Sequence, residues 1–315
     1  MKSVKVRVPA TTANCGPGFD AIGIALNFYN EMELTLLPEE GLEVLVEGVG
    51  AGLLPADESN VIVKTIRTFF DRLEREFHSS LDHFKGMRIK MNNQIPLSRG
   101  LGSSAAAIAA ALTAANEISG AKFSKEDIFV MATAIEGHPD NVAPAIFGGV
   151  TLSVASETSK TTDDEPQVHC LKFLPEAKFS LVAVIPEFEL PTNLSRQALP
   201  EVVPFADAVF NISRVALLTG ALLQGRLDYL KYALEDKIHQ PYRQKLITGM
   251  SDVLSAAKDK GALGAVISGS GPCLIAFAEN NEDAIGQAMV SAFEKHNVKA
   301  EYLKLTIDEE GAKVV

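Results

Sequence analysis

The sequence predicts an α+β protein built from two domains, and three observations support this. The chain has 315 residues, about twice the usual length of a single domain. Segments with the period-two alternation of strands are interleaved with segments of helical period along the whole chain. A polar, acidic stretch without periodicity, residues 156–167, interrupts them near the middle. We therefore expect an exposed loop there and domains over residues 1–165 and 166–315.

In the first half, strand patterns surround three helical segments. Strands are predicted over residues 4–8, 31–37, 42–46, 87–91 and 150–154. Residues 60–77 carry their apolar side chains on one stripe, which indicates an amphipathic helix. Residues 104–118 are small and apolar on nearly every side, so we expect a buried helix that ends at Gly120.

Ser124 and Asp127 have the spacing of a capping box and predict a third helix, which ends at Glu136 and Gly137.

The second half of the chain also mixes strands and helices. Strands are predicted over residues 179–185, 265–268, 274–278 and 301–306, and helices over residues 206–224, 227–235, 244–260 and 282–296.

Composition excludes several functions. Lys and Arg number 29 against 40 Asp and Glu, and the formal charge of −11 disfavours nucleic acid and anionic membrane surfaces as partners. Cys15, Cys170 and Cys273 are far apart, so neither a disulfide framework nor a zinc cage is indicated. No run approaches the ~20 consecutive apolar residues of a membrane span. These observations favour a soluble, cytoplasmic protein.

The most informative stretch is Pro96-Leu97-Ser98-Arg99-Gly100-Leu101-Gly102-Ser103-Ser104-Ala105-Ala106, the phosphate-loop segment. Its glycines permit a tight turn, and a helix follows at once. Unpaired N–H groups and the positive end of the helix dipole would then meet at one point, which is the physical basis of an anion site. A glycine turn with a serine cap would explain this stretch alone about equally well.

Two other glycine fingerprints do not fit this segment. The spacing Gly100-x-Gly102-x-x-Ala105 matches a dinucleotide loop, but no strand leads directly into it and no acidic strand end follows it. A Walker A loop requires a lysine after the glycines, and none is present. A bound nucleotide would therefore depend on backbone amides, the helix dipole and a metal ion.

Two further stretches are rich in glycine. The N-terminal glycine segment, residues 9–23, contains Asn14 and Asp20, and we expect a functional loop too irregular for a simple hairpin. Cys15 within it is interpreted as a packing residue. The C-terminal glycine segment, residues 264–277, predicts two strands joined by Ser-Gly-Ser-Gly-Pro, where bare backbone approaches another group. Ordinary turns remain the alternative for both.

A polar cluster, Glu136-Gly137-His138-Pro139-Asp140-Asn141, lies at a predicted helix C-terminus. The helix dipole disfavours the Glu136 carboxylate there, and a metal ion would offset that cost. Without a second histidine at helical spacing, His138 fits a hydrogen-bonded or substrate-contacting histidine better than a metal ligand.

Together, these segments resemble the GHMP kinases, which share an N-terminal P-A-x-x-x-N-x-G-x-G-x-D-type segment, a central P-x-x-x-G-L-G-S-S-A loop and a C-terminal G-x-x-x-S-G-S-G-P-type segment. The resemblance covers essentially the whole chain. Within the superfamily, A-T-T-A-N-C-G-P-G-F-D, H-P-D-N-V-A-P and the distant Arg243 are most similar to homoserine kinases. This implies a ribosomal-S5-like N-terminal nucleotide-binding domain and a ferredoxin-like C-terminal domain.

The resemblance also implies an activity and a site. The activity is ATP-dependent phosphorylation of the side-chain hydroxyl of L-homoserine, a step toward threonine. The implied ATP site comprises Asn60 and the phosphate-loop segment, residues 96–106, with Mg²⁺ at Ser104 and Glu136. The implied substrate shell comprises Asn14, Asp20, His138, Asn141, Thr192, Arg196, Arg243 and Gly269. Asp140, Asn141 and Arg196 are the expected catalytic residues.

Several alternatives stay open at this point. Asp140 could serve as a general base or as the metal ligand in place of Glu136, whereas homoserine kinases are thought to need no dedicated base. Another GHMP kinase, acting on mevalonate or a sugar, has the same chemistry, and a ligand-binding protein of this fold without activity is a third hypothesis. A homodimer is expected from the resemblance.

Overall fold

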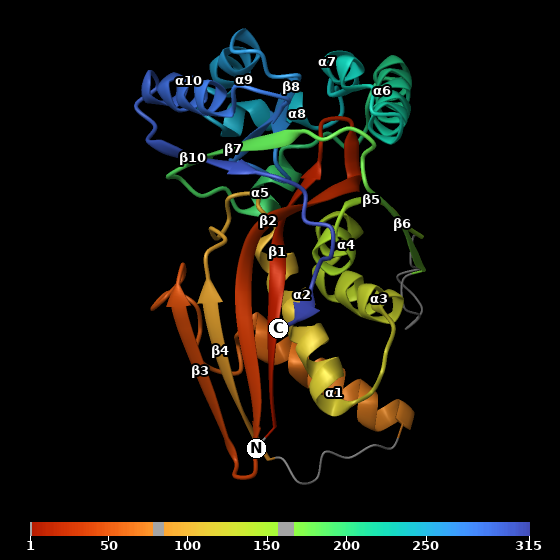
Figure 1. Cartoon of the computed structure of the whole chain (residues 1–315), viewed down its shortest axis with the longest axis vertical. Helices are drawn as coiled ribbons and strands as arrows, with labels where there is room; N and C mark the ends of the chain where they lie inside the picture. Colours follow the sequence, from red (N-terminus) through yellow and green to blue (C-terminus); the bar gives the residue numbers. More distant parts are fainter. Residues whose placement is uncertain (1, 78–84, 157–166) are drawn as a thin grey trace.

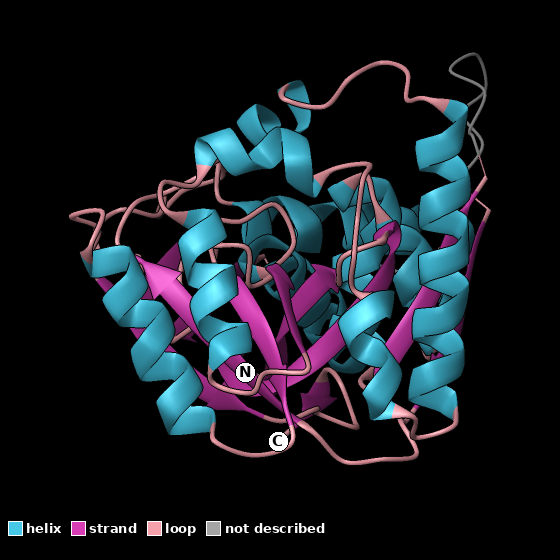
Figure 2. Ribbon diagram, turned by 90° about the horizontal axis from the view of Figure 1, so that it is seen from above, coloured by secondary structure: helices cyan, strands magenta, loops and turns pink. Residues whose placement is uncertain are grey.

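Two β-sheets organise the chain, and helices cover them (Figure 1). The computed structural model describes residues 2–77, 85–156 and 167–315. In this part of the chain one sheet has seven strands and the other has four. The view from above shows helices packed around the central strands (Figure 2). The predicted α+β class is confirmed.

The larger sheet comprises β1 (Lys2–Asn14), β2 (Gly18–Leu37), β3 (Gly41–Gly48), β4 (Gly86–Asn93), β5 (Val150–Ala155), β6 (Val168–Phe173) and β11 (Lys313–Val314). Its order is β11-β1-β2-β4-β3, with β5 paired to both β2 and β6. β3 and β4 are parallel, whereas β1 and β2 are antiparallel with register shifts at Pro9/Ala10 and Ala13/Asn14. These shifts lie where β1 approaches the functional site.

The helices of the larger sheet are α1 (Val61–Phe77), α2 (Ser103–Ser119), α3 (Lys125–Glu136) and α4 (Pro139–Phe147). α2 is central because it packs against β1, α1, α3 and α4. Its alanines allow this close approach, and Gly120 ends it in the left-handed conformation. The predicted capping box of Ser124 and Asp127 is present at the start of α3. Because α2 packs against its neighbouring elements, its first turn is fixed in place.

The smaller sheet comprises β7 (Ser180–Pro186), β8 (Gly264–Ile267), β9 (Leu274–Ala278) and β10 (Ala300–Leu305), all antiparallel in the order β10-β7-β9-β8. Two helices, α9 (Met250–Asp259) and α10 (Glu282–Glu294), pack on it. The remaining elements are α5 (Thr192–Gln197), α6 (Phe205–Leu223), α7 (Leu230–Ala233), α8 (Gln240–Arg243) and two 3-10 turns, Leu227–Tyr229 and Gln244–Leu246.

Several predicted boundaries are wrong for local reasons. The helix expected over residues 244–260 begins only at Met250, because Gly249 has a φ of 80° and breaks it. The segment 227–235 forms a 3-10 turn followed by the short α7. β6 and α4 were not predicted. The N-terminal glycine segment is also more regular than expected, since β1 and β2 form a hairpin whose turn is Cys15–Pro17.

The loop predicted over residues 156–167 lies, except for its ends, outside the described residues. β6 and β11 follow the predicted domain boundary in sequence but join the larger sheet. The boundary at residues 165 and 166 stays a prediction.

One helix in the described part of the chain, α6, is long and apolar enough to span a membrane by length and composition, with a mean hydropathy of 1.4 over the tested window. It carries Asp207 and Arg214, and each of these makes an ion pair within the chain. One helix of this kind is weak evidence for a membrane span, and 22% of the tested window is buried inside the structure.

Candidate active site

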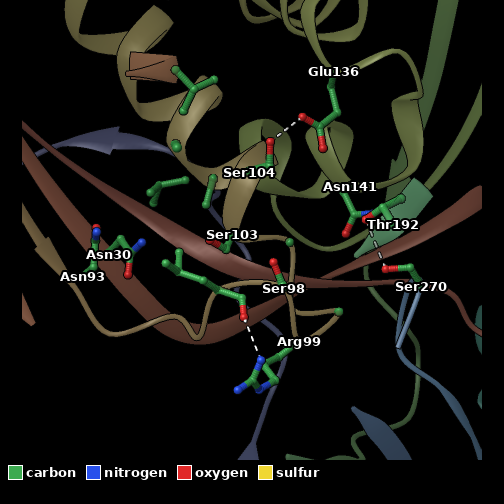
Figure 3. A pocket seen from close by; sticks show the side chains of 18 of the residues that line it. Asn30, Asn93, Ser98, Arg99, Ser103, Ser104, Glu136, Asn141, Thr192 and Ser270 are labelled. Carbon is green, nitrogen blue, oxygen red and sulfur yellow. Dashed lines mark hydrogen bonds between the residues drawn. The ribbon is translucent and has the colours of Figure 1, made fainter. Parts of the chain in front are cut away.

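A cavity of about 490 Å³ is lined by residues of β1, β2 and β4 in the larger sheet and by the turn that follows β8 in the smaller sheet. The phosphate-loop segment and the polar cluster at residues 136–141 contribute side chains, and so do α5, α8 and the turn between β8 and β9. Figure 3 shows how several of these side chains gather. The three stretches singled out by their glycines therefore meet at one site.

The phosphate loop is held by close backbone contacts. Gly100 and Gly102 have φ values of 80° and 69°, and a Cβ on Gly102 would lie 1.8 Å from the Thr11 hydroxyl oxygen. The Thr11 N–H donates to the Leu101 carbonyl at 3.1 Å. Ser268 Oγ donates to the Gly100 carbonyl oxygen at 2.6 Å. These contacts leave no room for a side chain at Gly102.

The start of α2 is the end of this loop at which the sequence predicts an anion site. Gly102 is its N-cap residue, and no side chain caps the first amides. Those N–H groups, together with the helix dipole, are available to a phosphate. The cavity is lined by most of the predicted loop, namely Leu97, Ser98, Arg99, Gly100, Gly102, Ser103, Ser104 and Ala106. Pro96, Leu101 and Ala105 do not line it, and the last two are buried in the core.

Asn60, predicted near the adenine, also lines the cavity but has a structural task. Its Oδ1 accepts from the Ile62 N–H at 2.9 Å and its Nδ2 donates to the Pro55 carbonyl at 2.7 Å. It thus caps the N-terminus of α1 and fixes one wall of the cavity.

Glu136 and Ser104 face each other across the loop (Figure 3). The Ser104 hydroxyl donates to Glu136 Oε2 at 2.7 Å. Burial raises the pKa of Glu136, and the Ser104 hydrogen bond and the nearby His138 offset only part of this. The described residues contain no group of three or more His, Cys, Asp or Glu side chains that could hold a metal by themselves.

His138, Asp140 and Asn141 are brought together at the start of α4. His138 Nδ1 lies 2.7 Å from Asp140 Oδ1, and Asp140 is only 2% exposed. Burial alone would lower the pKa of His138, but the hydrogen bond and charge of Asp140 raise it. Asn141 Oδ1 accepts from the Thr11 hydroxyl at 2.8 Å, which joins this cluster to β1.

The two predicted arginines differ in their partners. Arg196 donates to both carboxylate oxygens of Asp20, at 3.0 and 2.9 Å. Arg243 is 2% exposed and donates to the carbonyls of Ser195 and Gly269 at 3.3 and 3.1 Å. Among the described residues, no ion pair within 4.0 Å neutralises Arg243. Burial, and then the charge of Arg196, lower the pKa of Arg243 to about 10.

The remaining predicted residues line the same cavity. Asn14 Nδ2 donates to the Gly269 carbonyl at 2.8 Å, and its Oδ1 accepts from the Asp20 N–H at 2.9 Å. The Thr192 hydroxyl lies 3.3 Å from that of Ser270. Cys15 is buried with its pKa raised to about 12 by that burial, so it is a packing residue as interpreted.

Sequence reasoning missed several residues of the site region. Thr11 and Ser268 fix the loop, and Ser270, Asn30 and Asn93 line the cavity. The signal for Thr11, Ser268 and Ser270 was their place inside the glycine segments. Asn30 and Asn93 lie in strands and gave no such signal.

An anion-binding loop, a paired carboxylate and hydroxyl, and two cations in one cavity define a small-molecule phosphotransferase. Residues 60–149 match the family described as GHMP kinases N terminal domain, and residues 218–295 match GHMP kinases C terminal. The chain belongs to the GHMP kinase family, which uses ATP.

The similar proteins span nearly the whole chain. A homoserine kinase of Carboxydothermus hydrogenoformans is 43% identical, covering 98% of this chain and 96% of that protein. One of Moorella thermoacetica is 42% identical, with coverage of 98% and 99%. A crystal structure of homoserine kinase from Cytophaga hutchinsonii has a TM-score of 0.86 at 32% identity, covering 100% of this chain and 98% of that one.

Replacing Gly102 tests the role of the loop backbone. Gly102→Val places a β-branched side chain at a φ of 69° and against Thr11, so we expect ATP affinity to fall by at least tenfold. Ser103→Ala removes a hydroxyl but keeps the amide, so its effect should be much milder. Nucleotide titration of both variants measures this, and unchanged affinity in folded Gly102→Val would place the phosphates elsewhere.

Proposed function

We propose that the protein is a homoserine kinase, which transfers the γ-phosphoryl group of ATP to the side-chain hydroxyl of L-homoserine in threonine biosynthesis. One observation carries the choice of substrate. Arg243 is buried without an acidic partner among the described residues, in the cavity that also contains the phosphate loop. A buried guanidinium of this kind is suited to a small carboxylate.

The two ends of the substrate find complementary groups. We assign the α-carboxylate to Arg243, with Arg196 beside it. The ammonium group needs acceptors, which Asn14 and Asp20 supply as an amide oxygen and a carboxylate. His138, Thr192 and Gly269 complete the shell. The side-chain hydroxyl is then left to face the phosphate loop.

Phosphoryl transfer asks mainly for alignment and charge stabilisation, because the transition state is loose. Asn141 and Arg196 would orient the hydroxyl and stabilise charge on the transferred group. Asp140 is already engaged with His138 at 2.7 Å, and this favours a role in orienting that ring over a role as a free base. Transfer without a dedicated base is therefore the mechanism that we favour.

Mg²⁺ is part of the proposal, and the residues present fit it. Ser104 Oγ and Glu136 Oε2 lie 2.7 Å apart beside the loop, and both are hard oxygen ligands. Burial raises the pKa of Glu136, and a bound cation would offset the free-energy cost of its buried negative charge. When bound, Mg²⁺ neutralises phosphate charge, and it takes few protein ligands because phosphates and water supply the rest.

Location and assembly remain predictions. The acidic net charge of −11 supports a cytoplasmic protein without nucleic-acid or membrane-surface partners. The homodimer rests on the family resemblance alone.

A coupled ADP-release assay tests the proposed function. L-Homoserine, mevalonate, galactose and buffer alone are compared at equal ATP and Mg²⁺ concentrations. We expect release above background with L-homoserine and little with the other alcohols. Equal background with every alcohol would refute the kinase activity, and a preference for mevalonate or galactose would indicate another GHMP kinase.

Glu136→Gln tests the magnesium site. The variant keeps the shape and removes the charge, so activity should fall and more Mg²⁺ should be needed for half-maximal rate. Burial raises the pKa of Glu136 in the folded protein, so its ionised form lowers the free energy of unfolding as the pH rises above the carboxyl pKa. The Glu136→Gln variant without ligand should therefore melt at no lower temperature than wild type at pH 7. An unaltered Mg²⁺ dependence would move the ligand to Asp140.

Arginine variants test the carboxylate site with L-homoserine and its amide, which lacks the negative charge. Arg243→Ala should weaken binding of the acid by about 2–4 kcal/mol, or roughly 30- to 1,000-fold. Arg196→Ala should cost less, because Asp20 already neutralises Arg196. The amide should lose little in either variant, and lysine should rescue Arg243 only in part. If acid and amide weaken equally, the arginines position the fold or the phosphate.

A further inference from the structure

His239 is a fully buried side chain outside the cavity lining, and both of its ring nitrogens are engaged. Arg243 Nη1 lies 3.3 Å from His239 Nδ1, and the Gly16 carbonyl oxygen lies 2.7 Å from Nε2. A guanidinium can only donate, so Nδ1 must be the acceptor. The ring proton is then on Nε2 and is donated to Gly16.

The backbone around His239 is fixed by Asp236, whose side chain is also fully buried. Its Oδ2 accepts from the N–H groups of His239 and Gln240 at 3.0 and 2.6 Å. Its Oδ1 accepts from Asn211 Nδ2 of α6 at 2.8 Å. The ring therefore has little freedom to turn.

His239 joins two parts of the substrate site that are remote in sequence. On one side is Arg243, and on the other is Gly16, in the hairpin turn next to Asn14. The Phe19 ring lies 5.3 Å from the His239 ring, and the Arg243 guanidinium carbon lies 5.2 Å from the Phe19 centroid. Burial lowers the pKa of His239, in agreement with a neutral ring.

We propose that His239 is a positioning residue: its unprotonated Nδ1 holds the Arg243 guanidinium toward the substrate carboxylate, and its Nε2–H ties the ring to the hairpin turn. This inference rests on the proposed function, since it assigns the carboxylate to Arg243. His239 does not touch the substrate and acts through Arg243 alone. Its loss should therefore affect recognition of the carboxylate and leave ATP binding intact.

Two substitutions separate the two hydrogen bonds. The amide of His239→Gln can reach the Nε2 position, so it can donate to Gly16 but leaves Arg243 without its acceptor. The amide oxygen of His239→Asn lies near the Nδ1 position and can still accept from Arg243. His296→Gln is the matched control, because His296 follows α10 and contacts Asp252 of α9, outside the site.

We expect His239→Gln to raise KM for L-homoserine by about tenfold or more, with a smaller change in kcat. Its preference for L-homoserine over the amide should fall by a similar factor, while KM for ATP stays as in wild type. His239→Asn should retain most of the preference, and His296→Gln all of it. An unchanged acid preference in His239→Gln, or an equal loss in His239→Asn, would overturn the proposal.

A measurement on wild-type protein keeps the proposal testable if His239→Gln does not fold. ¹⁵N NMR of histidine-labelled protein, with His239→Asn to assign the signal, should show Nδ1 unprotonated and Nε2 protonated. The opposite tautomer or a doubly protonated ring would refute the arrangement. Failure of the proposed function would appear separately, as absence of L-homoserine phosphorylation by wild type.

Discussion

The site depends on one steric constraint, the close approach of three segments at glycines, where a side chain on Gly100 or Gly102 would find no room. The Gly102 Cα faces Thr11, and a Cβ on Gly100 would lie 2.2 Å from the Ser268 carbonyl oxygen. The Gly269 N–H donates to the Ala13 carbonyl at 3.0 Å, which closes the third side. Because backbone touches backbone, the phosphate loop has little room to move. The free amides at the start of α2 are thus held ready for an anion, so ordering the loop costs little when a nucleotide binds.

A second feature of the site is a pair of buried charged groups that lower the stability of the fold. Burial lowers the pKa of Arg243 to about 10 and raises that of Glu136, so burial disfavours both ionised groups. In the proposed complex, each of these groups lies next to a group of opposite charge. The substrate carboxylate faces Arg243, and Mg²⁺ faces Glu136. Binding in the proposed complex would relieve both costs, and part of the ligand affinity would therefore come from the pairing of these buried charges. The large alanine-rich core around α2 offsets these costs.

The sequence predicted the local features well and the long-range ones poorly. β9 over residues 274–278 and the capping box at Ser124 depend on neighbouring residues, and both are confirmed. α4 was not predicted because prolines are typical of loops, and this helix contains two. Pro139 is nevertheless favourable in the first turn, and Pro144 lies inside the helix. The predicted loop glycines do meet at one cavity, but the pairing of Arg196 with Asp20 depends on folding and has no local signal. His239 gave no signal at all, since a lone histidine in a polar loop has no distinguishing pattern.

In the proposed complex, the acceptors of the cavity explain a preference for a zwitterion over a simple acid better than its two arginines do. Asp20 neutralises Arg196, which leaves Arg243 to attract one carboxylate. On the other side, the proposed complex places the ammonium group against the Asp20 carboxylate and the Asn14 side-chain oxygen, and a substrate without an ammonium group would bury these oxygens without that contact. Unpaired buried polar groups discriminate more strongly than a missing methylene, because their desolvation is not repaid. Mevalonate could satisfy Arg243 but brings no cation to these acceptors, so selectivity for an amino acid would arise from the acceptor side of the cavity and not from its cations.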